Sequence, residues 1–239
     1  MRIIIVLLAA VLSYLIAGAV HEMGHVVVGL LSGWKFYLLV VGPVGIRRNE
    51  NDKISVYLEK NPALWGGVGG TFPKTESPDN IKVWSKILLG GPVASIIMGC
   101  AFLPFGILTL NALLLMLGFM PIGMGIACLL PLKTGITYTD GARWRRLHGE
   151  GQVKAEEIAL FKMAINDILK KDMSQIEYTD FEPLLHAELP AIKYYGYYYS
   201  YMFYKSRNDE ENVQKTLGLM DSIKKNVPKI VIDDCTEKQ

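Results

Sequence analysis

The sequence predicts an α-helical polytopic membrane protein with three spans and a short β hairpin, followed by a small soluble α-helical domain. Two observations support this prediction. Hydrophobic residues make up 51% of the 239 residues and are concentrated in residues 3–33 and 87–132. A helix of ~20 apolar residues is long enough to cross the hydrocarbon layer of a bilayer. Residues 149–239, by contrast, are rich in charged residues and have a helical apolar pattern.

Residues 3–33 are expected to form the first span. Arg2 and the apolar run that follows it resemble a secretory signal peptide with a small-residue cleavage site. The apolar stretch continues to Trp34, however, and is too long for the apolar region of a signal peptide. We therefore expect an uncleaved spanning helix.

Residues 35–60 are expected to form the β hairpin, and residues 61–80 a loop. Two β-favouring runs, 36–41 and 54–58, flank a Gly/Pro segment and a polar turn. The segment 61–80 contains WGGVGG and is otherwise rich in Gly, Pro and polar residues. Its glycines, which lie between two aromatic residues, could instead lie against the membrane.

Residues 87–132 carry no charged side chain and are expected to supply the second and third spans, at about 87–108 and 110–131. Two helices of ~20 residues fit in this segment if a tight turn joins them. The turn is expected within residues 104–111, where Pro, Gly, Thr and Asn cluster. The GGPVAS sequence at 90–95 consists mostly of small residues, which let spanning helices approach closely.

The distribution of basic residues predicts the orientation. Eight lysines and arginines lie between the first two spans, and Lys133, Arg143, Arg145 and Arg146 follow the third, whereas only Arg2 is on the opposite side. Loops rich in Lys and Arg remain in the cytoplasm. We therefore expect an integral membrane protein with its N-terminus outside and its C-terminal domain in the cytoplasm. The compact form suits a prokaryotic cell membrane.

The C-terminal region, residues 149–239, is expected to be a soluble cytoplasmic helical domain. Residues 193–205 contain seven tyrosines, which suggest a packed helix pair with an aromatic seam. A docking surface for a protein partner and contact with the membrane interface, where Tyr collects, are alternatives. Asn208-Asp209 offers an N-cap for the last helix. Apolar residues recur at helical spacing in two runs: Val153, Ile158, Phe161, Ile165 and Ile168, and Val213, Leu217 and Met220.

The composition also argues against some functions. The formal net charge is only +2, and no basic patch interleaved with aromatic residues indicates a nucleic-acid partner. The cysteines Cys100, Cys128 and Cys235 are odd in number and lack metal-type spacing. We expect them to be reduced residues with a packing role.

Chemistry is indicated by His21-Glu22-Met23-Gly24-His25, an H-E-x-x-H pattern inside the first span. On a helix the two histidines are one turn apart and can bind one Zn²⁺ ion. Glu22 can reach a metal-bound water as a general base. Ionisable residues cost ~2.5–3.5 kcal/mol each inside a membrane, so three within five residues indicate a functional metal site.

A catalytic zinc usually has three protein ligands, so one ligand must come from elsewhere. His148 and His186 are candidates, but His186 lies in the soluble region and His148 follows a basic run expected at the surface. Asp140, in an Asp-Gly pair shortly after the third span, is the better candidate. Asp-Gly is also a common turn pair, so a turn without a metal remains an alternative.

The order of three motifs resembles the site-2 protease family of intramembrane zinc metalloproteases. These motifs are H-E-x-x-H at 21–25, Gly-Pro-x-Ala-Ser at 91–95, and Pro131 followed by Asp-Gly at 140–141. The resemblance covers residues 1–146. It implies a three-span metalloprotease core in residues 1–148.

The resemblance also implies roles for individual residues. His21, His25 and Asp140 would be the zinc ligands, and Glu22 the general base. The substrate would be a membrane protein cut within or beside its own transmembrane segment, in the lipid bilayer.

The segment 35–60 would match the re-entrant β element with which this family holds its substrate as an extended strand. Within it, Val40, Val41 and Gly42 are candidate substrate-binding residues.

The chain departs from the family pattern N-x-x-P-x-x-x-x-D-G in two ways. Asp140 lies nine residues after Pro131 instead of five, and Cys128 stands in place of the Asn. Cysteine is a poor hydrogen-bond donor, so it is a weak replacement for an Asn that orients substrate. Cys128 remains a candidate substrate contact. The residues that could substitute for the Asn are Thr134, Thr137, Thr139 and Asn111.

Two other functions are compatible with the sequence. A non-proteolytic scaffold would bind transmembrane segments and signal through the soluble domain. A metal-handling membrane protein would use the histidines to line a translocation path. The second is less favoured because such a path does not need Glu22 beside the histidines, and no His- or Asp-rich loop gathers metal.

Overall fold

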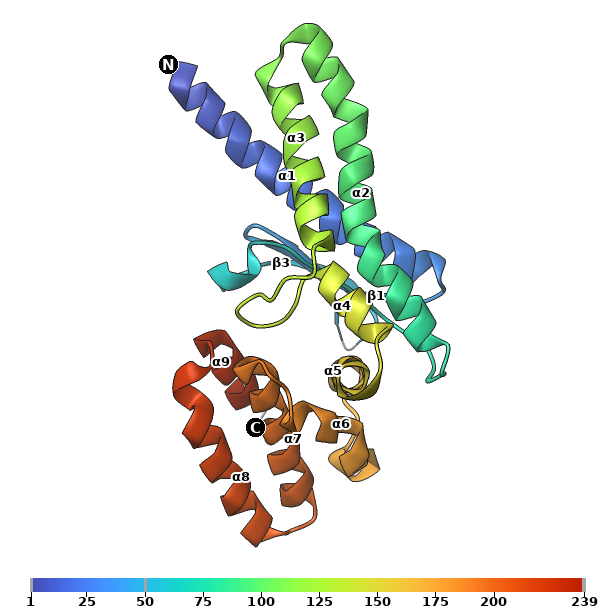
Figure 1. Ribbon diagram of the computed structural model, residues 1–239, viewed down its shortest axis with the longest axis vertical. Coiled ribbons are helices and arrows are strands. Elements are labelled where there is room, and N and C mark those ends of the chain that lie inside the picture. The colour runs from blue at the N-terminus through green and yellow to red at the C-terminus, as the bar shows by residue number, and fades with distance from the viewer. Residues whose placement is uncertain (1, 50, 238–239) are drawn as a thin grey trace. The chain divides into compact units, whose positions relative to one another are not determined.

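The computed structural model describes residues 2–49 and 51–237 and is mostly helical (Figure 1). It divides into two compact units, Met1–Pro131 and Leu132–Gln239. From the sequence we expected the membrane core to end at residue 148. In the structure, Tyr138 and Ala142 belong to the same buried apolar cluster as Phe181 of the C-terminal helices.

The first unit contains three long apolar helices: α1 (Arg2–Leu31), α2 (Asn80–Thr109) and α3 (Ala112–Leu129). Each is long and apolar enough to cross a membrane, judged by length and composition. Figure 1 shows α2 and α3 as an antiparallel pair. Their turn lies at Leu110 and Asn111, inside the expected range, and Asn111 caps α3 by accepting a hydrogen bond from the Leu114 N–H at 3.2 Å.

The helices of the first unit approach closely at glycines. A Cβ added to Gly24 would lie 2.4 Å from the carbonyl oxygen of Gly90, so α1 and α2 touch backbone to backbone inside the H-E-x-x-H segment. A Cβ on Gly125 of α3 would lie 2.7 Å from the carbonyl oxygen of Pro92. The small residues at 90–95 therefore allow this packing, as the sequence indicated.

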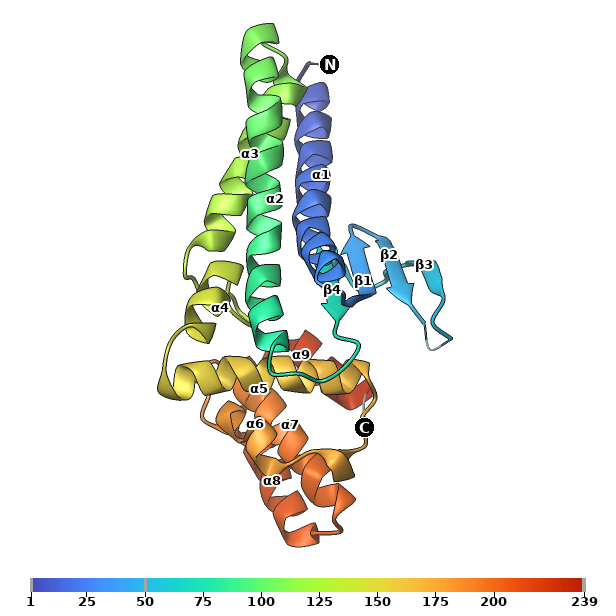
Figure 2. The same cartoon turned by 90° about the vertical axis from the view of Figure 1, so that its right-hand side faces the viewer.

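A four-stranded antiparallel sheet lies beside the C-terminal part of α1 (Figure 2). Its order is β3-β2-β1-β4. The strands are β1 (Lys35–Val41), β2 (Val44–Arg48), β3 (Ile54–Leu58) and β4 (Val68–Phe72), and a short 3₁₀ helix, η1 (Pro62–Leu64), precedes β4.

Two expectations about this segment are wrong. The runs 36–41 and 54–58 do not pair with each other, because β2 lies between them. Residues 61–80 are not only a loop, because they contain β4, which pairs with β1. The sequence of β4, VGGTF, has weak β propensity, but ladder hydrogen bonds need only the backbone.

The second unit consists of helices packed around one apolar core. Phe181 and Leu184 are completely buried in it, together with Tyr194, Tyr198 and Tyr199 of the tyrosine-rich segment 193–205. The helices are α4 (Asp140–Leu147), α5 (Gly151–Ile168), α6 (Tyr178–Leu185), α7 (Pro190–Ser206), α8 (Glu210–Ile223) and α9 (Lys229–Glu237), with the 3₁₀ helices η2 (Met173–Gln175) and η3 (Lys224–Asn226).

The tyrosine-rich segment forms most of α7, and its aromatic packing is confirmed. The rings of Phe181 and Phe203 are 5.6 Å apart, and those of Tyr198 and Tyr199 are 5.4 Å apart. Asp209 caps α8, as expected, by accepting a hydrogen bond from the Asn212 N–H at 3.2 Å. That helix is not the last one, however, because α9 follows it.

Candidate metal site on the first helix

The two histidines of the H-E-x-x-H segment lie one turn apart on α1 and are buried. His21 is 5% exposed and His25 is 8% exposed. Their ring centroids are 5.0 Å apart, with the ring planes nearly perpendicular at 82°. Both side chains point towards α2, because residues of that helix contact both rings. The helical prediction for this segment is confirmed.

Each histidine is held by a hydrogen bond at its Nδ1 atom. His21 Nδ1 lies 3.0 Å from the hydroxyl oxygen of Ser95, which is itself fully buried. His25 Nδ1 lies 2.7 Å from the carbonyl oxygen of Ile87. A carbonyl only accepts, so His25 carries its proton on Nδ1 and keeps a lone pair on Nε2. A partner that fixes one ring nitrogen in this way is typical of histidines that bind metal through the other nitrogen.

His25 Nδ1 also has a second, longer contact besides the hydrogen bond to the Ile87 carbonyl. The Gly91 N–H lies 3.3 Å from the same atom. One Nδ1 cannot donate to Ile87 and accept from Gly91 together, and the bond to the carbonyl is shorter by a wide margin. We therefore assign the proton to Nδ1 and treat the Gly91 contact as secondary.

The two Nε2 atoms converge beside Gly91. A Cβ added to this glycine would lie 2.4 Å from Nε2 of His25 and 2.9 Å from Nε2 of His21. Only glycine leaves room for both rings at this point of α2. Two convergent, oriented imidazole nitrogens in a buried site fit the donor set of Zn²⁺, which binds histidine nitrogen at ~2.0–2.1 Å.

Glu22 is half-buried and lies against the glycine-rich chain that leads into β4. A Cβ added to Gly67 would lie 3.0 Å from Glu22 Oε1, and one added to Gly69 would lie 3.0 Å from Oε2. Gly67 also has φ +115°, a conformation that favours glycine. The backbone of residues 67–69 therefore covers the Glu22 carboxylate closely.

The glycines of WGGVGG are functional candidates that sequence reasoning missed. We interpreted them as part of a loop or as a contact with the membrane. The signal was present in the density of glycines, because such a run often marks a close backbone approach. The sequence could not show that the approached group is Glu22.

Replacing Gly67 by Ala is expected to displace the Glu22 carboxylate while leaving the histidines in place. The new methyl would clash with the Glu22 side chain and strain a backbone at φ +115°. If Glu22 acts as a general base, a shift of about 1 Å costs ~10²-fold in turnover. Gly66→Ala is the matched control, since a Cβ there meets nothing within 4 Å. Equal activity of the two variants, measured with equal bound zinc, would contradict this role of the glycine strand.

Val40, Val41 and Gly42, the candidate contacts to a substrate strand, lie at the end of β1 and directly after it. Val40 lies in the central strand β1, and its neighbours Gly45 and Val68 pair with it on both sides. Val41 pairs with Val44, and the Gly42 N–H donates to the Trp65 carbonyl at 3.1 Å. At Val40, β1 therefore offers no free edge to a further strand. The edges of the sheet are β3 and β4, and β4 is the one beside Glu22.

Cys128 lies in the last turn of α3, within the first unit. It is half-buried, and its Sγ is within 4.8 Å of a ring nitrogen of His21. Asn111, one of the residues considered as a replacement for the family Asn, caps the opposite end of α3. At 1.5 Å per residue, the 18-residue helix separates its two ends by ~27 Å. Asn111 is therefore too far from Cys128 to take the place of the family Asn.

Asp140 is the first residue of α4, in the second unit, and is half-buried. The segment before it folds back on itself, since Lys133 and Tyr138 form an antiparallel bridge. Thr139 N–H donates to the Leu132 carbonyl at 3.0 Å, and Leu132 N–H donates to Thr139 Oγ1 at 3.1 Å. The additional residues between Pro131 and Asp140 are thus looped out as a small hairpin, with Leu132 paired to the residue that precedes Asp140.

The threonines of this hairpin bond within it. Thr134 Oγ1 donates to the Thr137 carbonyl at 2.9 Å, and the Thr137 N–H donates back to Thr134 Oγ1 at 3.0 Å. Thr139 Oγ1 also bonds to Leu132. Thr134, Thr137 and Thr139 therefore hold the hairpin together, which is a structural role.

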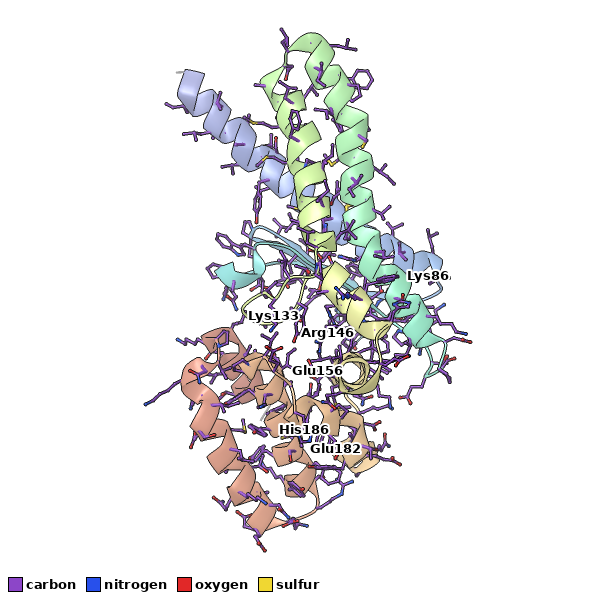
Figure 3. All side chains as sticks on the ribbon, in the orientation of Figure 1. Lys86, Lys133, Arg146, Glu156, Glu182 and His186 are labelled. Atoms are coloured by element: carbon purple, nitrogen blue, oxygen red, sulfur yellow. The ribbon has the colours of Figure 1, made fainter. Side chains whose placement is uncertain are left out.

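A buried ionic cluster anchors the hairpin within the second unit. The Arg146 guanidinium lies 4.0 Å from the centre of the Tyr138 ring and pairs with Glu156 (Figure 3). Arg143 pairs with the fully buried Glu157 at 2.7 Å. Burial raises the pKa of Glu156, and the Arg146 charge opposes that shift.

His148 and His186 are both exposed residues of the second unit. His148 follows α4 and stacks on Trp144, with ring centroids 4.3 Å apart. His186 ends α6. Both therefore lie at the surface of the second unit, as expected for His148.

Comparison of the chain with protein-family models, with curated proteins and with solved structures found no match. The candidate site in the first unit consists of two buried, oriented histidines and a glutamate under a glycine-rich strand.

Proposed function

We propose that the protein is an intramembrane zinc endopeptidase that cleaves a membrane protein within or next to its transmembrane segment. The observation that carries this proposal is the arrangement of His21 and His25. Their Nδ1 atoms are fixed by α2 while their Nε2 atoms converge beside Gly91. Glu22, the adjacent residue, is held under the glycine-rich strand. This combination fits zinc hydrolysis better than it fits a helix that only packs.

Each residue then has a separate role. His21 and His25 would hold the zinc through Nε2, with Asp140 as the third protein ligand. When bound, the zinc would lower the pKa of a water molecule towards ~7 and polarise the scissile carbonyl. Glu22 would take the proton of that water and later deliver it to the leaving amine.

The hairpin of residues 132–139 supports Asp140 as the third ligand. The family pattern has five residues from Pro to Asp, and this chain has nine. Pairing of Leu132 with Thr139 closes residues 132–139 into a hairpin, so the extra length does not separate Asp140 from Leu132 in space.

A transmembrane segment as substrate explains the apolar setting. The three long apolar helices suit insertion into a bilayer, and the basic residues that precede α2 and follow α3 suit a cytoplasmic location for both loops and for the C-terminal unit. A helical substrate must unwind before its peptide bond can be attacked. The edge strand β4 could hold the unwound strand by backbone hydrogen bonds next to Glu22.

Substrate trapping tests this proposal. The full chain carrying Glu22→Gln is expressed in membranes, cross-linked and purified, and proteins captured with it are identified. We expect single-span proteins that are cut when co-reconstituted with the unmodified chain. Captured proteins that bind equally well and are never cut would indicate a membrane scaffold and overturn the enzymatic proposal.

Asp140→Ala is expected to reduce bound zinc and cleavage together. Loss of one of three protein ligands should weaken zinc binding by roughly 10–100-fold or more, since loss of an outer-shell partner already costs that much. Zinc per chain is measured after dialysis against a weak chelator. Asp79→Ala is the control, because Asp79 is exposed and pairs with Lys82 at 2.8 Å. Unchanged zinc content and activity in Asp140→Ala would assign the third ligand elsewhere.

A further inference from the structure

Cys128 lies near the metal-binding face of α1. Its Sγ is within 4.8 Å of a ring nitrogen of His21, and both residues belong to the first unit. The inference that follows concerns the zinc site of the proposed function and rests on it. The sequence alone predicted a packing role for Cys128, since the three cysteines lack metal-type spacing.

The distance and the chemistry suit coordination. Zinc binds thiolate at ~2.3 Å and histidine nitrogen at ~2.0–2.1 Å, so N and S ligands of one tetrahedral ion lie ~3.6 Å apart. A thiol within 4.8 Å of the nitrogen reaches that separation by a small side-chain adjustment. Thiolate is also a preferred ligand of zinc.

The hydrogen bond to Ser95 fixes the orientation of the His21 ring. Its Nδ1 is engaged by Ser95, as is typical of a histidine that binds metal through Nε2. That atom lies beside Gly91, and so does Nε2 of His25. Nε2 of His21 is therefore close to Nε2 of His25, and a ring nitrogen of His21 is within 4.8 Å of the Cys128 Sγ.

We propose that the Cys128 thiolate is a further ligand of the zinc and occupies the position that a catalytic site leaves to water. A site with four protein ligands is closed, whereas a catalytic site keeps one position open. With Cys128 bound, the zinc has no open position for water, and the resting protein is inactive. The sulfur–zinc bond forms as the thiol proton leaves to solvent, and it breaks as water enters and the sulfur takes up a proton.

Cobalt substitution tests this proposal without an activity assay. The full-length Glu22→Gln protein in detergent is loaded with Co²⁺, and its near-ultraviolet absorption is recorded. A thiolate ligand produces an intense sulfur-to-cobalt charge-transfer band. We expect the band in this protein and its loss when Cys128→Ala is added, with the Co²⁺ dissociation constant rising roughly tenfold or more.

Controls separate coordination from folding. Cys100→Ala in the same background should keep the band, because Cys100 is an exposed residue of α2 away from the histidines' anchoring residues. Cys128→Ser, which nearly conserves volume, should lose the band as well. It is measured beside Cys128→Ala so that a packing defect in one variant does not decide the result.

The outcomes distinguish this proposal from the function it rests on. Cobalt bound through the histidines without the band overturns the role of Cys128 and leaves the zinc endopeptidase intact. No cobalt bound by any variant overturns both. Proteolytic activity offers a second measurement, made with a substrate identified by the trapping experiment. Cys128→Ala should cleave this substrate faster than the unmodified chain. Slower cleavage would contradict a closed resting site.

Discussion

Glu22→Gln is expected to abolish cleavage while bound zinc stays at the level of the unmodified chain. The amide cannot accept the proton of a metal-bound water, and general-base catalysis contributes typically 10²–10⁴-fold to a rate. The exchange is nearly isosteric, so the contacts of Gly67 and Gly69 with this side chain remain possible. The histidine ligands are separate side chains and keep their anchors on α2.

Two measurements check this expectation together. Zinc per chain is determined by elemental analysis, and cleavage is followed in proteoliposomes with single-span peptides that carry a fluorophore and a quencher on opposite sides of the cut. Glu59→Gln is the control, since Glu59 accepts hydrogen bonds from the Asn61 N–H and the Tyr57 hydroxyl away from the histidines. Full activity of Glu22→Gln would reject the mechanism. Loss of zinc along with activity would instead give Glu22 a structural role in the site.

Gly91→Ala is expected to destroy the metal site with little change elsewhere in the helix. The new methyl would lie 2.4 Å from Nε2 of His25 and 2.9 Å from Nε2 of His21, closer than any real Cβ contact. Either both rings rotate away from each other, or α1 and α2 separate at a cost of typically 1–3 kcal/mol. In both cases the two nitrogens no longer converge. We expect at least a tenfold loss of zinc affinity, with activity falling in parallel.

The matched control for this variant is Gly123→Ala. Gly123 is also a glycine in a long apolar helix, α3, but a Cβ there meets nothing within 4 Å. Its zinc content, activity and thermal unfolding should equal those of the unmodified chain. Normal zinc binding by Gly91→Ala would show that the ligand atoms are not the Nε2 pair.

Much of the helical framework could be predicted from local sequence. The first span was expected at 3–33, and α1 covers Arg2–Leu31. The turn between the other two was expected within 104–111 and lies at Leu110 and Asn111. Long apolar runs specify such helices because the backbone of a span must satisfy its own hydrogen bonds. The start of α2 at Asn80 was missed, since Lys82 and Lys86 interrupt the apolar run that marked the expected span.

The sheet was less predictable. The hydrophobic runs identified β1 and β3, but strand order depends on which backbones meet, and β2 separates them. Strand β4 carries too few side chains with β preference to be recognised, and its partner β1 lies far from it in the sequence. For the same reason the sequence could not show that β1, which contains Val40 and Val41, is a central strand.

The sequence by itself brought together the residues of the candidate site. Residues at positions i and i+4 of a helix share a face, so His21 and His25 could be paired from their spacing alone, with Glu22 beside them. Tertiary structure decided everything that depends on contact between distant segments. It assigned Ser95 and Ile87 as the anchors of the rings, Gly91 as the residue between them, and the glycine-rich strand as the cover of Glu22. These contacts arise from helix and strand packing across 40 to 75 residues of chain, roughly, and no local pattern encodes such a separation.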